Sequence, residues 1–187
     1  EIGSGLVGSE MCIRDRINTV FMAVMSMILT CLTAAMAGYA LAKKRFVGRK
    51  LLFTLIVCAM ALPKQVILIP LLREMSALNL YNTIWAVIFP IVGWPFGVFL
   101  MRQAFLAIPK ELEEAALMEG CRWWQVLFRV LLPMSWPSVL AFATVSITYH
   151  WNEYLWPLMM LNDPDKQVLT VGLVSFAMGA ESGGQWG

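Results

Sequence analysis

Charged side chains are scarce in this sequence. Asp, Glu, Lys and Arg make up 14% of its 187 residues, whereas hydrophobic residues make up 59% and the mean hydropathy is +0.70. Soluble globular domains are usually about 45 to 50% apolar, so this composition excludes an ordinary soluble domain and indicates a chain that lies in a lipid bilayer. The net charge of +2 is too small to indicate nucleic-acid binding.

Side chains that bind metals or perform catalysis are also few. The sequence has one histidine, His150, and four isolated cysteines without the CxxC spacing of a zinc site. Two of the cysteines, Cys31 and Cys58, lie in apolar runs, where cysteine is commonly a small buried hydrophobe. The sequence has no HExxH pattern and no Gly-x-x-x-x-Gly-Lys-Ser/Thr phosphate loop. We therefore expect no metal site, no bound cofactor and no enzymatic activity in this chain.

Long apolar runs are present instead. A spanning helix needs roughly 20 apolar residues, and the four stretches 17–42, 51–72, 80–101 and 130–149 meet this length. Prolines fall in or beside them at positions 63, 70, 90, 95, 133, 137 and 157. Because proline lacks a backbone N–H, these positions predict kinked or broken helices. The predicted fold class is all-α: a polytopic membrane helical bundle with four spanning helices.

Basic residues are distributed unequally between the runs. The stretch "KKRFVGRK" at 43–50 holds five and the segment 102–129 holds four, while the loops after the second and fourth runs hold one each, Arg73 and Lys166. The positive-inside rule therefore predicts that loops 43–50 and 102–129 are cytoplasmic and that the other two loops face outward.

Small side chains form a regular stripe on the first run. Thr30, Ala34, Gly38 and Ala42 recur every four positions and therefore share one face of a helix. Such a stripe lets another backbone approach closely, so it predicts a helix–helix contact.

The two ends of the chain differ from the rest. Residues 1–16 show no helical periodicity and no secretory signal, and "VGSEMCIRDR" resembles a translated sequencing-adapter tail found on genes predicted from environmental reads. We expect a non-native or disordered tail, with native sequence starting near Ile17. At the other end, "VLTVGLVSFAMGA" at 168–180 is too short to span and fits an external interfacial helix.

The stretch "ELEEAALMEG" at 111–120 concentrates four of the twelve acidic residues in a predicted cytoplasmic loop. Pro109 suits the first turn of a helix, the acids suit its positive end and Gly120 suits its stop, which predicts a helix of about three turns. Glu111 and Glu113 are expected to act only as favourable charges at the helix start. Taken alone, the stretch also fits a solvated loop helix.

The longer stretch "EAALMEGCRWWQVLFRVLLP" resembles the EAA loop of ABC importer permeases. The family pattern is Glu-Ala-Ala, three residues, Gly, nine residues and Ile-x-Leu-Pro. It falls here on Glu114, Ala115, Ala116, Gly120, Val130, Leu132 and Pro133, with Val130 in place of the usual Ile. The resemblance implies a cytoplasmic coupling helix that docks into an ATPase subunit. Glu114 would offer a polar contact, the alanines would permit close approach and Gly120 would permit a sharp exit.

Four further stretches fall in the order expected of the carbohydrate-importer, maltose-permease-like branch of this family. They are "YALAKKRFVGRK", "ALPKQVILIPLL", "LNLYNTIWAVIFP" and "WNEYLWPLMML", and the resemblance covers residues 17–187. Members of this branch are binding-protein-dependent inner-membrane components that generally have six spanning helices. The resemblance therefore implies a transmembrane domain truncated at both ends.

This resemblance implies the permease subunit of an ATP-driven sugar importer in the bacterial inner membrane. A second permease would complete the translocation path, two cytoplasmic ATPase subunits would use ATP and Mg²⁺, and an extracytoplasmic binding protein would deliver the solute. The identity of the sugar stays open, as does whether the two permeases are the same protein. The alternatives are an importer of another polar solute, such as a polyamine or glycerol phosphate, and a secondary carrier.

Polar residues within the apolar runs are candidates for the solute path, because such groups are costly in a bilayer unless they serve a purpose. The candidates are Lys64, Gln65, Trp94, Trp151, Asn152, Glu153 and Tyr154. Lys64 fits a wet cavity, a subunit interface or a side chain that snorkels to the membrane surface. The island at 151–154 combines aromatic and hydrogen-bonding groups suited to sugars, but also suits interfacial anchoring or contact with a binding protein.

Overall fold

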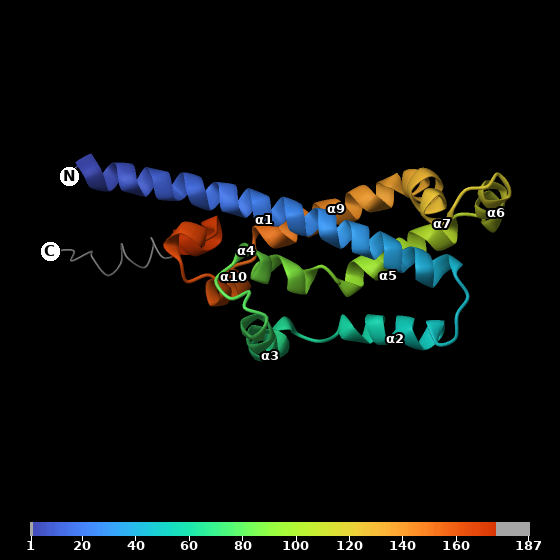
Figure 1. Cartoon of the computed structure of the whole chain (residues 1–187), viewed down its shortest axis with the longest axis horizontal. Coiled ribbons are helices and arrows are strands. Elements are labelled where there is room, and N and C mark those ends of the chain that lie inside the picture. Colours follow the sequence, from blue (N-terminus) through green and yellow to red (C-terminus); the bar gives the residue numbers. More distant parts are fainter. Residues whose placement is uncertain (1, 175–187) are drawn as a thin grey trace. The chain divides into compact units, whose positions relative to one another are not determined.

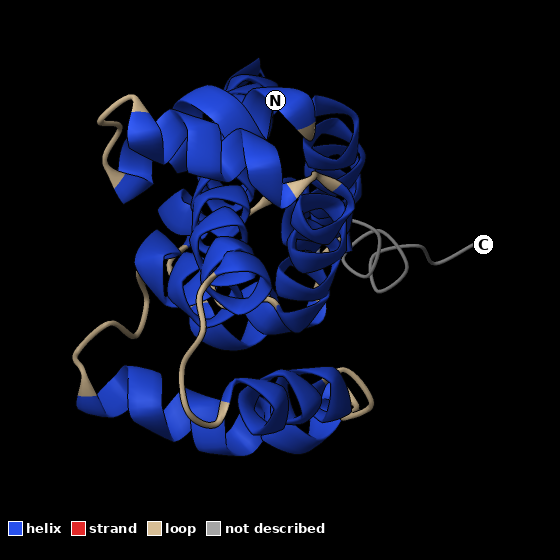
Figure 2. Cartoon of the chain, turned by 90° about the vertical axis from the view of Figure 1, so that its right-hand side faces the viewer, coloured by secondary structure: helices blue, strands red, loops and turns tan. Residues whose placement is uncertain are grey.

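The structure, a computed structural model, describes the backbone of residues 2–174 and the side chains of 13–163 and 165–174. Every element within 2–174 is helical, as the all-α prediction requires (Figure 2). In chain order the helices are α1 (Ile2–Lys43), α2 (Arg49–Ala59), α3 (Lys64–Ala77), α4 (Ile84–Ile88), α5 (Pro95–Ala107), α6 (Lys110–Met118), α7 (Trp123–Gln125), α8 (Leu132–Met134), α9 (Trp136–Trp151) and α10 (Leu155–Met160) (Figure 1). Three short elements join them: 3-10 turns η1 (Phe89–Ile91) and η3 (Pro164–Lys166), and a π-helix η2 (Val126–Leu131).

One helix segment, Ile13–Lys43 of α1, is by itself long and apolar enough to cross a membrane. Three more candidates are pairs of helices separated by a short break: α2 with α3, α4–η1 with α5, and the run Trp123–Met134 with α9. The described chain therefore has one to four candidate spans, and four matches the predicted number. The pairs also correspond to the second, third and fourth apolar runs.

Proline positions explain the breaks. Pro63 precedes α3, Pro90 and Pro95 flank the second break, and Pro133 and Pro137 flank the break at Ser135. The prediction of broken helices is therefore confirmed at these positions. At Pro70 there is no break, because this residue lies inside α3 without interrupting it.

The start of α1 differs from the prediction. The helix begins at Ile2, well before Ile17, where native sequence was predicted to start. That residues 1–16 are a non-native or disordered tail stays a prediction. Once a helix is nucleated, each further residue adds a hydrogen bond, and the run 17–42 supplies a long nucleus. At the other end, residues 169–174 are helical, and positions 175–180 of the predicted interfacial helix lie outside the described residues.

The chain divides into two compact units, which are described separately. Unit 2 comprises residues 27–64 and 91–146. Its core contains residues from α1, α5, α6, η2 and α9, namely Ala34, Ala35, Tyr39, Ala42, Met101, Phe105, Ile108, Ala116, Val126, Leu127, Leu131 and Phe142. This core is the setting of the predicted coupling helix.

The small-residue stripe on α1 packs inside unit 2. Thr30, Ala34, Gly38 and Ala42 are all buried, which confirms the predicted helix contact. At Gly38 the approach to α5 is so close that a Cβ atom would lie 2.7 Å from Met101 Cβ. Only glycine fits at this crossing without a shift of the neighbouring helix.

Unit 1 comprises residues 1–26, 65–90 and 147–187. Within it α10 packs on α4, and Trp156 donates its indole N–H to the Ala86 carbonyl over 3.1 Å. In the loop after α10, the Asp165 backbone N–H donates to Asp163 over 3.1 Å. This bond, with Lys166 beside it, holds the pKa of the Asp163 carboxyl below its usual range.

Candidate functional site

Helix α6 carries Glu114, Ala115 and Ala116 of the EAA motif, and specific residues mark its start and its end. Pro109 occupies the N-cap position, one residue before α6 starts, whereas the prediction placed it in the first turn. At the other end Gly120 has φ +84°, its N–H donates to the Leu117 carbonyl over 3.0 Å, and the Cys121 N–H donates to the Ala116 carbonyl over 3.1 Å. This pair of bonds is the Schellman motif, which places a left-handed residue after the helix. The predicted stop at Gly120 is confirmed.

The inner face of α6 is formed by Glu113 and Ala116, both only 8% exposed. Ala116 belongs to the core of unit 2. Glu113 accepts a hydrogen bond of 3.2 Å from the Tyr39 hydroxyl of α1, and Lys44 Nζ lies 3.9 Å from the same carboxylate oxygen, Oε1. Lys44 Nζ also lies 5.1 Å from the centre of the Tyr39 ring, within cation–π range. A buried carboxylate with these partners attaches α6 to the end of α1.

Further bonds hold the segment that leads into α6. Lys43, the last residue of α1, donates to the Ile108 carbonyl over 2.7 Å. Within α5, Arg102 Nε donates to the Leu41 carbonyl over 3.3 Å. Both bonds reach the same end of α1, so they join that end to α5 and to the segment before α6.

The outer face of α6 is open. Glu114 and Ala115 of the predicted ATPase-coupling site are exposed, and so are Leu117 and Met118, the latter 89% exposed. A helix held on one side and carrying exposed apolar side chains on the other is a surface suited to a partner. The alanine pair is therefore split, with Ala115 on the open face and Ala116 in the core.

The downstream end of the motif follows the π-helix η2. Leu132 is half-buried and packs against the same core as Ala116, whereas Pro133 is exposed. In η2 the Leu132 N–H donates to the Leu127 carbonyl, five residues earlier. Pro133 cannot donate a backbone hydrogen bond, and the wider π turn ends at Leu131, two residues before it.

Sequence reasoning missed Glu113, which was expected only to favour the helix start. The spacing Glu113-x-x-Ala116 puts both residues on one face of the helix. The sequence does not show that this face, and not a neighbouring one, is buried. Knowledge of which face meets Tyr39 requires the fold. The sequence feature that could have indicated this buried face is the spacing of three residues between an acid, Glu113, and a small residue, Ala116.

Lys64 and Trp94, two of the solute-path candidates, belong to unit 2. Lys64 is the first residue of α3, directly after the break at Pro63, and its side chain is exposed. Trp94 caps α5 and packs against the core, with its ring centre 5.7 Å from that of Phe142. Trp94 therefore contributes to the packing of unit 2, and its place in the solute path stays a prediction.

Gln65 and the island at 151–154 belong to unit 1. Gln65, Trp151 and Asn152 are exposed, and the Asn152 amide donates to the Thr148 carbonyl over 2.7 Å. Glu153 and Tyr154 are half-buried, in a turn whose Glu153 carbonyl accepts from Thr170 over 2.9 Å. A shared solute site for all these residues stays a prediction. Among the described residues, no group of three or more His, Cys, Asp or Glu side chains is arranged to hold a metal ion.

Comparison with known proteins gives a consistent result. The chain is 37% identical over 158 residues to the arabinooligosaccharides transport system permease protein AraQ of Halalkalibacterium halodurans, covering 84% of this chain and 57% of that protein. It is 33% identical over 163 residues to the diacetylchitobiose uptake system permease protein NgcG of Streptomyces coelicolor, covering 86% and 54%. The chain thus spans little more than half the length of these relatives.

A solved structure has the same fold. It belongs to a bacterial ABC transporter involved in the import of the acidic polysaccharide alginate, and it matches with a TM-score of 0.80 and 25% identity over 92% of this chain and 64% of that one. The helices and this likeness define an α-helical membrane protein of the ABC importer permease class. Residues 34–183 match the binding-protein-dependent transport system inner membrane components, and the chain belongs to that family.

Proposed function

We propose that this chain acts as a permease subunit of an ATP-driven sugar importer and is coupled to cytoplasmic ATPase subunits through α6. The two-sided structure of α6 carries the proposal: Glu113 and Ala116 are fixed in the core, while Glu114, Ala115 and Met118 face outward. The permeases AraQ and NgcG, named for oligosaccharide transport and uptake, support a sugar as the solute.

In this proposal ATP binding draws the two ATPase subunits together, and each moves the coupling helix seated in its surface. Here that movement would reach α1 through the Tyr39–Glu113 bond and the Lys43–Ile108 bond. The membrane helices would then reopen toward the outside and accept solute from the binding protein. The loops 43–50 and 102–129 face the cytoplasm in this arrangement.

Transport by the assembled importer tests the proposal. The permease is combined with a second permease, two ATPase subunits and the binding protein in sealed vesicles, and ATP-dependent uptake of labelled oligosaccharides is measured. We expect uptake that requires ATP and the binding protein. Uptake of polyamine or glycerol phosphate in preference to any sugar would overturn the solute assignment, and uptake without ATPase subunits would indicate a secondary carrier.

A further inference from the structure

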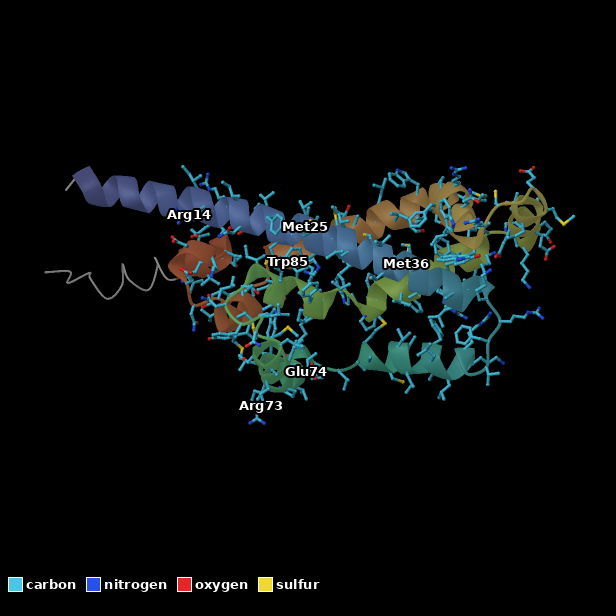
Figure 3. All side chains as sticks on the ribbon, viewed as in Figure 1. Arg14, Met25, Met36, Arg73, Glu74 and Trp85 are labelled. Carbon is cyan, nitrogen blue, oxygen red and sulfur yellow. The ribbon has the colours of Figure 1, made fainter. Side chains whose placement is uncertain are left out.

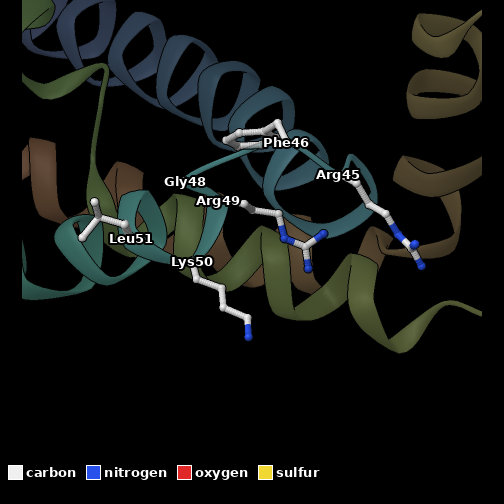
Figure 4. Close-up of a pocket in the computed structure, with 6 residues that line it drawn as sticks. All are labelled: Arg45, Phe46, Gly48, Arg49, Lys50 and Leu51. Carbon is white, nitrogen blue, oxygen red and sulfur yellow. The ribbon is translucent and has the colours of Figure 1, made fainter.

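A basic hollow lies at the turn between α1 and α2, apart from α6. It has a volume of about 560 Å³ and is lined by Arg45, Phe46, Gly48, Arg49, Lys50 and Leu51 (Figure 4). In the close-up, the side chains of Arg45 and Arg49 point to the right and that of Lys50 points down, whereas Leu51 lies at the left. All six residues belong to unit 2.

The local backbone makes this arrangement possible. Gly48 has φ +84°, and the Arg49 N–H donates to the Phe46 carbonyl over 3.4 Å, which closes a tight turn. Because of this turn, Arg45 lines the same hollow as Arg49 and Lys50, although three residues lie between Arg45 and Arg49. Arg49 spends one donor on the Lys44 carbonyl over 3.0 Å, and a guanidinium has five N–H donors, so most of its donors stay available.

The positive charge of the hollow is not neutralised by neighbouring acids. Within the described part of the chain, the acidic partners found for basic groups are Asp165 for Arg14, Glu113 for Lys44 and Asp163 for Lys166. None of these pairs involves Arg45, Arg49 or Lys50. Three cations around one open space therefore attract an anion, and two guanidinium groups suit the oxygens of a phosphate.

Apolar surface begins directly beside the charges. Phe46 and Val47 are exposed in the turn, and the exposed side chains of Leu51, Leu52 and Leu55 follow along α2. No residue of α2 is buried. Its contact with α5 includes Phe53, whose ring stacks on Phe99 with centres 6.2 Å apart. The outer side of α2 is thus an exposed apolar surface that begins next to the basic residues of the turn.

We propose that the hollow binds the phosphate of an anionic phospholipid headgroup, with the acyl chains lying along the exposed side of α2. The order of charge and then apolar surface matches the order of headgroup and chain in a lipid, and basic clusters at the end of a spanning helix attract anionic lipids. The inference rests on the proposed placement of the chain in a membrane, but it does not depend on which solute is carried.

Lipid binding to the full chain tests this site. The chain is purified in neutral detergent and titrated with phosphatidylglycerol or with phosphatidylcholine, and bound lipid is counted by native mass spectrometry. We expect tighter binding of phosphatidylglycerol, weakened as ionic strength rises. Each of Arg45→Gln, Arg49→Gln and Lys50→Gln should reduce its affinity about fivefold, since one basic residue near a lipid surface contributes about that much. Arg45→Lys should keep most of the affinity.

The matched control is Arg73→Gln, because Arg73 is an exposed basic residue on α3 whose side chain points away from the ribbon (Figure 3). It should leave phosphatidylglycerol binding unchanged. Equal binding of the two lipids, or equal losses in the control and the Arg49→Gln variant, would overturn the proposal. If inorganic phosphate alone binds as tightly as the lipid, the ligand is a free phosphate and not a headgroup. No transport is measured, so a failure here and a failure of the sugar proposal are distinguishable.

Discussion

The Tyr39 hydroxyl donates to the Glu113 carboxylate over 3.2 Å, and this bond joins the end of α1 to the predicted coupling helix α6. Both side chains are buried in unit 2. Loss of one partner would leave a buried polar group with fewer hydrogen bonds, which commonly costs about 1–3 kcal/mol. The pair is therefore both a stabilising contact and the most direct link between α6 and a spanning helix.

The first prediction concerns this pair. Tyr39→Phe should lower thermal stability of the purified chain, and Glu113→Gln should do so as well. In a double-mutant cycle the two changes should be non-additive by about 0.5–3 kcal/mol, because they remove the same bond. Glu114→Gln is the control, since Glu114 is exposed on the same helix. Additive losses in the cycle would show that the two side chains do not interact.

The second prediction concerns Gly120, whose φ of +84° is unfavourable for other residues. A Cβ at this position would meet nothing within 4 Å, so the cost is conformational and not steric. Gly120→Ala should destabilise the helix end by about 1–2 kcal/mol, and Gly120→Asn by less, because asparagine tolerates this conformation. Thermal unfolding measures the stabilities of the unaltered chain, Gly120→Asn and Gly120→Ala, which should decrease in that order. Equal stability of the three chains would contradict the role of the Schellman motif.

Gly120→Asp adds a charge to the same position and separates folding from coupling. We expect it to impair ATPase association or solute-stimulated ATP hydrolysis in the assembled importer. Gly120→Asn has nearly the same shape without the charge and is the matched control. Normal solute uptake and normal solute-stimulated ATP hydrolysis in the Gly120→Asp variant would contradict a contact between this end of α6 and the ATPase.

The third prediction concerns glycines at helix crossings. At Gly97 a Cβ would lie 2.3 Å from the tip of the Phe142 ring, whereas at Gly93 it would meet nothing within 4 Å. Gly97→Ala should therefore lower stability by about 1–3 kcal/mol, and Gly93→Ala should have little effect. In a chain that also carries Phe142→Leu, the loss of stability caused by Gly97→Ala should be smaller, as measured by thermal unfolding. A Gly97→Ala chain as stable as the Gly93→Ala chain would contradict this packing.

The fourth prediction concerns topology. Val47 and Leu78 are both exposed and lie in loops that the positive-inside rule assigns to opposite sides of the membrane. With the native cysteines replaced, Val47→Cys should react with a membrane-impermeant thiol reagent only after the cells are opened, while Leu78→Cys should react in intact cells. The reverse pattern would invert the proposed orientation and move α6 to the outside.

Sequence patterns predicted the local features of this chain because these depend on neighbouring residues. The apolar runs, the stop at Gly120 and most of the proline breaks follow from length, glycine and the missing proline N–H. The stripe Thr30 to Ala42 was also predictable, since small residues four apart share one face. Each of these conclusions needed only a short window of sequence.

Features that depend on distant contacts were not predictable in the same way. The sequence could not show that Tyr39 meets Glu113 and not Glu114. Tyr39 and Glu113 are 74 positions apart, and both glutamates suit a helix start. The surroundings of Lys64 were not predictable for a related reason: Lys64 follows a break in the helix, and the course of the chain after a break depends on distant contacts. Solute-path residues stay predictions, because a path is formed by several segments together.

Contact between α6 and an ATPase subunit is the most direct test of the whole account. A photo-reactive side chain is introduced at Met118, which is 89% exposed on α6, and at Val47 as an exposed control on the other predicted cytoplasmic loop. In the assembled importer the account predicts a crosslink to the ATPase from position 118 whose yield changes with ATP, and none from position 47. An importer that transports solute but gives no ATPase crosslink from position 118 would contradict it.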